Sequence, residues 1–152
     1  MAVLGVSKSG FFLLLDYLFI IHYSLCMKLL GIDYGTKRIG FAMGDTDQKI
    51  AFPRDVVEGH VKALDYVDRM IDYEGAQKVV MGIPVRHSGE EGRLTPDIRA
   101  FAKEVTEKFG VEVLFQNEIF STKAIQQGTV SKDKTDAASA ALILQSYLDS
   151  VK

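Results

Sequence analysis

The sequence predicts a single α/β domain built on a mixed β-sheet, with helices on both faces of that sheet. Three short apolar segments come first and are separated by turn-rich sequence, which is typical of antiparallel strands joined as a meander. Helical and strand-like periodicities then alternate towards the C-terminus, which is typical of parallel strands connected through helices. The composition, 47% hydrophobic and 25% charged residues in a chain of 152, is that of an ordinary globular domain.

The predicted meander accounts for the first half of the sheet. Its first strand is expected at residues 28–34, an apolar run closed by Gly35. Its second and third strands are expected at residues 39–44 and 50–57. The polar stretch 44–48 provides the turn between these two strands, so both connections are short enough for antiparallel pairing.

A helix and a strand are expected next. Apolar side chains recur at helical spacing over residues 60–73, and Gly75 offers a left-handed end to this helix. Residues 78–83 form the fourth expected strand, which Pro84 stops, and a polar loop then runs to Arg93. A strand that follows a helix in this way is expected to pair in parallel.

The same alternation continues to the C-terminus. Thr95 is expected to cap a helix, Pro96 to begin it and Gly110 to end it. The fifth strand is expected at residues 111–115. The remaining expected elements are a short helix capped by Ser121 or Thr122 and running to Gln127, a polar loop over residues 128–134 and an alanine-rich helix over residues 136–151.

The first residues of the chain do not fit this domain. Residues 11–21 are almost continuously apolar, but this run is too short to span a membrane. The length would suit an export signal, but Lys8 is the single positive charge before the segment and no small-residue cleavage site follows it. These two features disfavour an export signal. Because Met27 directly precedes the first expected strand, we assign residues 1–26 to an extension outside the native domain, which is expected to cover residues 27–152.

Charge and cysteine content exclude several functional classes. Eighteen Lys and Arg residues against twenty Asp and Glu give a net charge of −2, which excludes binding of nucleic acid by bulk positive charge but not by a local basic patch. A single cysteine, Cys26, excludes an intramolecular disulfide framework and a multi-cysteine zinc site. We therefore expect a cytoplasmic protein that does not bind membranes.

Three acidic residues are expected at the edge of the sheet where the parallel strands end. Asp33 ends the first strand, Glu118 follows the fifth and Asp136 begins the last helix. Acids are common at such positions, for solubility or for the helix dipole. Asp33 differs, because a carboxylate in a buried strand is costly unless it is paired or bound to a metal. Converging carboxylates would repel one another, and a divalent cation would relieve that repulsion.

Ordered motifs along the chain carry a family resemblance. They are IDYGTKRIG at 32–40, MGIP at 81–84, GEEG at 89–92, AFA at 100–102 and KTDAASAALILQSYL at 134–148. In this order they resemble the YqgF/RuvX family, which is described both as Holliday junction resolvases and as nucleases that mature the precursor of 16S rRNA. The first motif alone is weak evidence, because actin-like kinases and ATPases also use it, whereas the ordered set is specific.

The resemblance implies a ribonuclease H-like fold and metal-dependent cleavage of phosphodiester bonds in structured nucleic acid, either pre-16S rRNA or branched DNA. It implies that Asp33, Glu118 and Asp136 are catalytic and hold Mg²⁺ or Mn²⁺. Carboxylate oxygens are hard ligands suited to these hard cations, and two such ions can activate water and stabilise the leaving oxygen. A homodimer is expected if the substrate is a two-fold junction.

Basic residues near these acids are candidates for contacts with phosphates. Lys37 and Arg38 follow the first acid in a turn, although a solvated turn would carry such charges as well. His87 is interpreted as an ordinary loop histidine. Phosphate contacts would make binding sensitive to salt and largely independent of sequence. The further candidates are Arg86 and Arg93 in the loop after the fourth strand, and Lys123, Lys132 and Lys134 near the last helices.

Two departures from the family pattern leave other functions open. Asn117-Glu118-Ile119 replaces the usual Asp-Glu-Arg, and VRHSG at residues 85–89 replaces an asparagine followed by Asp-Gly. These changes affect the positioning of substrate rather than the fold, so the alternative is a nucleic-acid-binding or ribosome-associated factor with weak or no catalysis. A fragment of an actin-like phosphotransferase is a third possibility, disfavoured because that chemistry needs two lobes.

Overall fold

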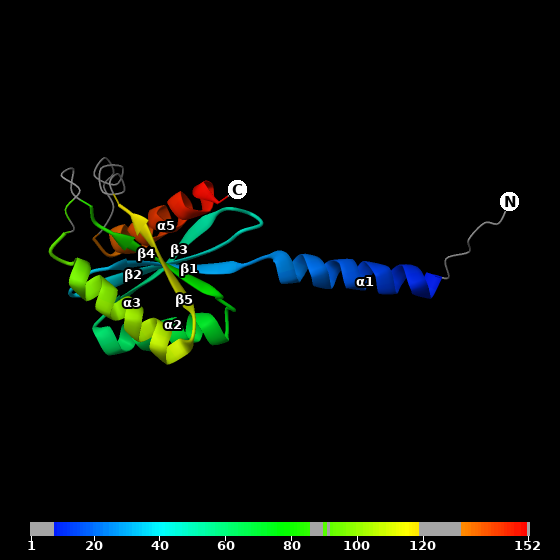
Figure 1. The fold of residues 1–152 in the computed structure, drawn as a ribbon, viewed down its shortest axis with the longest axis horizontal. Helices are drawn as coiled ribbons and strands as arrows, with labels where there is room; N and C mark the ends of the chain where they lie inside the picture. Colours follow the sequence, from blue (N-terminus) through cyan, green and yellow to red (C-terminus); the bar gives the residue numbers. More distant parts are fainter. Residues whose placement is uncertain (1–7, 86–89, 91, 119–131, 152) are drawn as a thin grey trace.

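A five-stranded sheet organises the chain in this computed structural model, which describes residues 8–85, 90, 92–118 and 132–151. The order of the strands across the sheet is β3-β2-β1-β4-β5. Figure 1 labels each of these strands. β1 pairs antiparallel with β2 and parallel with β4, so the predicted mixed sheet is confirmed. The strands are β1 (Lys28–Tyr34), β2 (Arg38–Asp45), β3 (Ala51–Glu58), β4 (Lys78–Ile83) and β5 (Glu112–Asn117).

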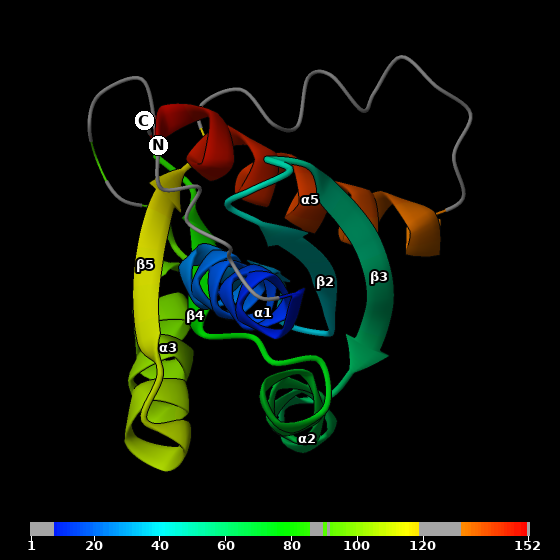
Figure 2. The ribbon, with the colours of Figure 1, turned by 90° about the vertical axis from the view of Figure 1, so that its right-hand side faces the viewer.

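Helices cover both faces of this sheet, as predicted. α5 (Lys132–Ser150) crosses one face, whereas α2 (His60–Asp72) and α3 (Thr95–Phe109) lie against the other (Figure 2). Because successive side chains of a strand point to opposite faces, each strand contributes to two separate apolar layers. The chain therefore has one core under α2 and α3 and a second under α5.

The core under α2 and α3 is built from large side chains. Phe41 packs against Tyr66 with ring centroids 4.5 Å apart, and Tyr34 packs against Phe101 at 5.1 Å. The tilted arrangement of both pairs is one that aromatic rings favour. Bulky side chains of this kind fill the space between the sheet and these two helices.

The core under α5 is built differently, because glycines of the sheet face this helix. A Cβ atom at Gly31 would lie 2.8 Å from Cβ of Leu144 and 2.9 Å from the carbonyl oxygen of Ala140. A Cβ atom at Gly40 would overlap the backbone carbonyl of Asp136. Glycine at these positions lets the backbone of α5 lie directly against the strands, closer than a layer of side chains would allow.

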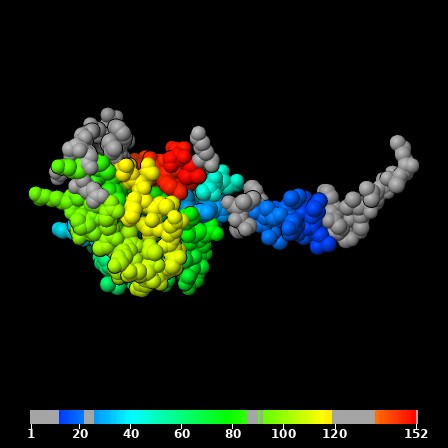
Figure 3. Space-filling view, in the orientation of Figure 1, coloured from blue at the N-terminus to red at the C-terminus, as the bar shows by residue number. Residues whose placement is uncertain are grey.

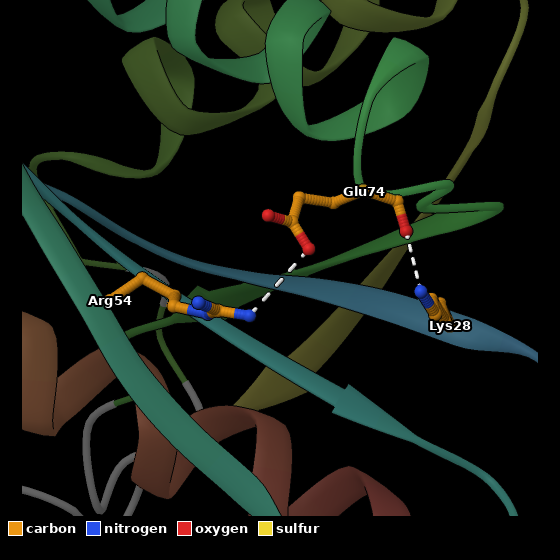
Figure 4. Close-up of polar contacts among 3 residues, drawn as sticks. All are labelled: Lys28, Arg54 and Glu74. Atoms are coloured by element: carbon orange, nitrogen blue, oxygen red, sulfur yellow. Dashed lines mark hydrogen bonds and ion pairs between the residues drawn. The ribbon is translucent and has the colours of Figure 1, made fainter.

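Polar contacts join the connection between α2 and β4 to the amino-terminal end of β1 (Figure 4). Nζ of Lys28 donates a hydrogen bond to the backbone oxygen of Glu74 at 2.9 Å. An ion pair links Nη2 of Arg54 on β3 to Oε2 of Glu74 at 3.7 Å, and both of these side chains are exposed. Exposed pairs of this type add little to stability, so these contacts orient the connection more than they hold the fold together.

The last helix begins earlier in the structure than predicted. α5 begins at Lys132 and not at Asp136, so part of the predicted loop 128–134 is helical. Asp136 consequently lies beyond the first turn of α5. The helix dipole acts mainly on the first turn, so it does not account for an acid at this position. The short helix predicted to run from Ser121 or Thr122 to Gln127 lies outside the described residues.

Other boundaries differ from the predictions by a few residues. Leu94 is the N-cap of α3, and Thr95 is the first helical residue, with a buried hydroxyl for which the described residues provide no hydrogen-bond partner. β5 is shifted towards the C-terminus and ends at Asn117. α2 ends before Gly75, whose φ of 76° is left-handed as predicted for a glycine after a helix. Gly110 caps α3 in the left-handed conformation, with φ of 68°, as predicted.

The helix α1 (Lys8–Leu25) stands away from the domain (Figures 1 and 3). The apolar side chains of its residues 12–21 are exposed, with Phe12 and Phe19 each 67% accessible to solvent. The two apolar cores contain no described residue before Met27. No helix in the described part of the chain is long and apolar enough to cross a membrane.

We predict that a protein beginning at Met27 folds without residues 1–26. Met27 is held by its own contacts, since its backbone exchanges hydrogen bonds with Thr46, each 3.0 Å long. Removal of α1 should leave the midpoint of thermal unfolding within about 3 °C of that of the full chain, because no core contact is lost. Differential scanning calorimetry on both proteins measures this, and loss of a cooperative transition in the shorter protein would place α1 in the fold.

Candidate functional site

Asp33 lies at the carboxyl end of β1, on the face that α5 covers. Its partner in the antiparallel ladder is Gly40 on β2. On the other side, Ile32 pairs with Met81 of β4, so the next residue along β4 is Gly82. Asp33 is therefore flanked by a glycine on each neighbouring strand, and the surface of the sheet beside it carries no side chains.

The other two predicted acids approach Asp33 over these glycines. A Cβ atom at Gly82 would overlap the carboxylate of Glu118, and one at Gly40 would overlap the backbone of Asp136. The backbone N–H of Glu118 donates to the carbonyl of Ile83 at 3.0 Å, which fixes Glu118 beyond the end of β4. The structure thus brings Asp33, Glu118 and Asp136 to one edge of the sheet.

Burial of these acids changes their protonation. Burial, followed by the negative charge of Asp136, raises the pKa of Asp33 to about 6, and a hydrogen bond from Ser139 on α5 opposes this rise. Burial, followed by the charge of Asp33, raises the pKa of Glu118 to about 7. Near neutral pH the edge of the sheet therefore holds carboxyl groups that ionise only at a cost in stability.

Asp136 has a counter-ion of its own. Nε of Arg38, the first residue of β2, lies 3.2 Å from Oδ2 of Asp136, and the two side chains are 20% and 28% exposed. Arg38 was predicted to contact phosphate, and in this structure it pairs with one of the acids. Beside the pair is a hollow of about 430 Å³ lined by Gly35, Thr36, Lys37, Arg38, Glu58 and Asp136.

The donor set fits a divalent cation by its chemistry. Mg²⁺ and Mn²⁺ prefer carboxylate oxygens, and a cation beside Asp33 and Glu118 would offset the burial and repulsion that raise their pKa values. The carboxylate of Asp136 is paired with Arg38. In this conformation no three His, Cys, Asp or Glu side chains among the described residues are arranged to hold a metal ion.

The remaining predicted basic residues are only partly described. Lys37 is exposed in the turn between β1 and β2. Arg93 is also exposed, and the hydrogen bond of 3.1 Å from the Gly92 N–H to the Pro84 carbonyl keeps its loop near the end of β4. Lys132 and Lys134 lie in the first turn of α5, with side chains outside the described part. Arg86, His87 and Lys123 fall outside the described residues altogether.

Sequence reasoning missed three features of the site, namely the hydrogen bond from Ser139, the two flanking glycines and the pairing of Arg38 with Asp136. A signal for the serine was present, because Ser139 follows Asp136 by one helical turn and so shares its face of α5. The alternation of side chains along β2 and β4 places Gly40 and Gly82 on the face that α5 covers. This alternation is a second signal that the sequence contains. The ion pair had no signal, because Arg38 and Asp136 are distant in sequence.

Comparison with known sequences identifies one protein family. The family described as "RuvX: Holliday junction resolvase" matches residues 27–150. A protein of Chlorobaculum tepidum named "Putative pre-16S rRNA nuclease" is 38% identical over 136 residues, which cover 81% of this chain and 94% of the relative. A protein of the same name from Escherichia coli is 32% identical over 131 residues, covering 80% of this chain and 95% of the relative.

Solved structures show the same fold at low sequence identity. Thermus thermophilus RuvC, solved in complex with a Holliday junction substrate, aligns with a TM-score of 0.55 and 13% identity, over 83% of this chain and 98% of that one. The resolvase of Fowlpox virus, solved with Holliday junction DNA, aligns with a TM-score of 0.53 and 16% identity, over 82% and 98%. These likenesses confirm the expected ribonuclease H-like fold.

The raised pKa values predict how stability depends on pH. In the unfolded chain Asp33 and Glu118 ionise near 3.8 and 4.5, whereas in the folded, metal-free protein they hold their protons to about 6 and about 7. Between the unfolded and the folded pKa values, the folded state therefore binds more protons than the unfolded state. The contribution of Asp33 and Glu118 to the free energy of unfolding is consequently largest below pH 4 and falls as pH rises through 7. We predict that Asp33→Asn is more stable than the wild type at pH 8, by on the order of 1–3 kcal/mol. At pH 5 we predict a smaller gain in stability.

Denaturant unfolding of both proteins in EDTA at these two pH values measures the difference. Ser139→Ala provides the control, because loss of its hydrogen bond should raise the pKa of Asp33 further and steepen the decline of stability with pH. A stability difference between Asp33→Asn and the wild type that is the same at pH 5 and pH 8 would contradict the burial of an ionisable group at this position.

Proposed function

The chain belongs to the RuvX family of Holliday junction resolvases, and from this premise we propose that it is a metal-dependent endonuclease that cleaves phosphodiester bonds in structured nucleic acid. The observation that carries the proposal is the convergence of Asp33, Glu118 and Asp136 at the edge of the sheet where its parallel strands end. Acids gathered at a buried edge destabilise the metal-free protein, and such sites are typical of function rather than of folding.

We assign Asp33, Glu118 and Asp136 as the residues that hold Mg²⁺ or Mn²⁺. The bound cation would supply an activated water and stabilise the charge on the leaving oxygen. The chain's own contribution is to keep the carboxylates in place. Ser139 orients Asp33 through its hydrogen bond, and the packing of Glu118 over Gly82 leaves its carboxylate little freedom to turn. Loading requires Asp33 and Glu118 to lose their protons, so metal binding should strengthen as pH rises.

The favoured substrate is the precursor of 16S rRNA. The relatives named for that activity are 38% and 32% identical to this chain, whereas the structures solved with Holliday junctions share 13% and 16%. Holliday junction DNA is the second substrate to test, and with it a homodimer would place one active site at each of two symmetry-related strands of the junction. A ribosomal precursor as substrate also implies a cytoplasmic location.

We propose that basic residues around the acids hold the phosphate backbone. Lys37 and Arg93 are exposed, Lys37 in the turn after β1 and Arg93 in the loop that returns to the end of β4. Contacts of this kind fix the register of the strand without reading its sequence. The other residues assigned to this role are Arg38, Arg86, Lys123, Lys132 and Lys134.

The proposal predicts that Asp33→Asn abolishes cleavage and keeps binding. Loss of a metal ligand should reduce the cleavage rate by at least about 100-fold, whereas affinity for nucleic acid should change by less than about threefold, because phosphate contacts come from Lys and Arg. Gel assays of a labelled pre-16S rRNA fragment and a four-way DNA junction, with Mg²⁺ and with Mn²⁺, measure both quantities.

The matched control is Asp65→Asn, which removes an exposed carboxylate from α2 on the opposite face of the sheet. This variant should cleave as the wild type does. A wild type that binds both substrates but cleaves neither, with either cation, would contradict the nuclease and favour a binding factor, the function that Asn117 and Ile119 left open.

A further inference from the structure

The two edge strands of the sheet, β3 and β5, differ in how well they resist pairing with a further strand. β3 contains Pro53, which has no N–H to donate, then the charged Arg54, and a register shift interrupts its ladder with β2. Features of this kind prevent the addition of a strand to an edge. β5 reads EVLFQN and pairs with β4 in unbroken register. Its charged side chain, Glu112, lies 2.7 Å from Nζ of Lys78.

An apolar groove runs beside β5, between this strand and α3. Its volume is about 420 Å³, and its apolar lining is Ala102, Val113 and Phe115, of which Phe115 is 40% exposed. In the space-filling view β5, drawn in yellow, lies at the surface beside α3 (Figure 3). A strand added to this edge would therefore cover apolar groups as well as pair with the backbone. Polar side chains of α3 complete the lining, namely Arg99, Lys103, Thr106 and Glu107.

The sequence of β5 is suited to pairing with itself. Val113 packs in the core under α2 and α3, whereas Leu114 packs in the core under α5, so Val113 and Phe115 share the face towards α3. Directly opposite residues of an antiparallel pair lie on the same face of the sheet. A two-fold axis at Leu114 would place Val113 of each copy opposite Phe115 of the other. Both grooves would then receive an apolar side chain from the other copy.

The charges along the groove favour the same arrangement. The guanidinium of Arg99 lies over the ring of Phe115, 5.3 Å from its centroid. Glu107 lies two turns further along α3, within 3.7 Å of Lys103. Because α3 connects two parallel strands, it runs opposite to β5, so the Glu107 end of the groove lies towards the beginning of β5. Two-fold pairing would bring the Glu107 end of each copy towards the Arg99 end of the other, and such complementarity fixes orientation.

We propose that β5 is the interface of a homodimer, in which the β5 strands of two copies pair antiparallel about a two-fold axis at Leu114. The two sheets become one continuous sheet, with both α5 helices on the same face. The two acidic edges then lie on that face and are related by the two-fold axis. The interface contains none of the proposed metal ligands, so the inference stands or falls independently of cleavage. It assigns a surface to the homodimer that a two-fold nucleic-acid substrate would require.

Sedimentation velocity of the full chain over a range of micromolar concentrations tests the interface. We expect the wild type to dimerise and Phe115→Lys to raise the dissociation constant at least about tenfold, because it places an ammonium group at two symmetric positions of the apolar contact. The matched control is Phe52→Lys, which makes the same change on β3, where Phe52 is 53% exposed. Its effect should be below about twofold.

Cross-linking tests the register and does not require Phe115→Lys to fold. In a Cys26→Ser background, Val113→Cys and Phe115→Cys are oxidised separately and as a mixture. We expect disulfide-linked dimers in the mixture, since a two-fold axis at Leu114 places these positions directly opposite each other. Either variant alone should cross-link at least about tenfold less, because its two cysteines would be offset by two residues, roughly 7 Å along the strands.

Several results would overturn the inference. A wild type that stays monomeric at every concentration would refute the dimer. A wild type that dimerises as tightly as Phe115→Lys would place the interface elsewhere, for example on the apolar helix α1. Equal weakening by Phe115→Lys and Phe52→Lys would exclude a specific role for β5. Cross-linking in the single variants that matches the mixture would exclude the axis at Leu114. Loss of cleavage in Asp33→Asn, or its absence in the wild type, changes none of these results.

Discussion

The direct packing of α5 on the sheet is the constraint on which the rest of this structure depends. At Gly31 and Gly40 no side chain of the sheet separates the strands from the helix, so α5 lies directly against β1 and β2 at these two positions. Because the helix lies this close, Asp136 and Ser139 are near enough to Asp33 to interact with it. A layer of larger side chains would keep them apart. The same device recurs on β4, where Gly82 leaves room for the carboxylate of Glu118. Small residues on one face therefore build the site as much as the acids do.

The electrostatic consequence is that the acids of the site destabilise the fold locally. The core under α2 and α3 buries aromatic and aliphatic side chains, whereas the opposite face buries carboxyl groups whose charged forms are disfavoured. A hydrogen bond from Ser139 to Asp33 and the ion pair of Arg38 with Asp136 offset part of this cost. Proteins accept such conflicts at functional sites, where a ligand resolves them. A divalent cation is the ligand that would match this donor chemistry.

Sequence reasoning predicted the strand order along the chain and the three acids, because both leave local patterns. Apolar runs closed by Gly35 or Pro84 mark strands, and an acid at the end of a buried strand is conspicuous. It misplaced the start of α5, because the polar residues before Asp136 read equally well as a loop. It assigned Arg38 to phosphate only, because a contact between the start of β2 and the last helix depends on tertiary packing that no local pattern encodes.

The central claim is that Asp33 and Glu118 are held with raised pKa values until a cation takes them. Titration of their carboxyl carbons by ¹³C nuclear magnetic resonance, without metal and with saturating Mg²⁺, tests it most directly. The account predicts apparent pKa values of about 6 and about 7 without metal, and values below about 5 for both with Mg²⁺. Values near 4 in both conditions would contradict it, because the carboxylates would then ionise freely and have no need of a cation.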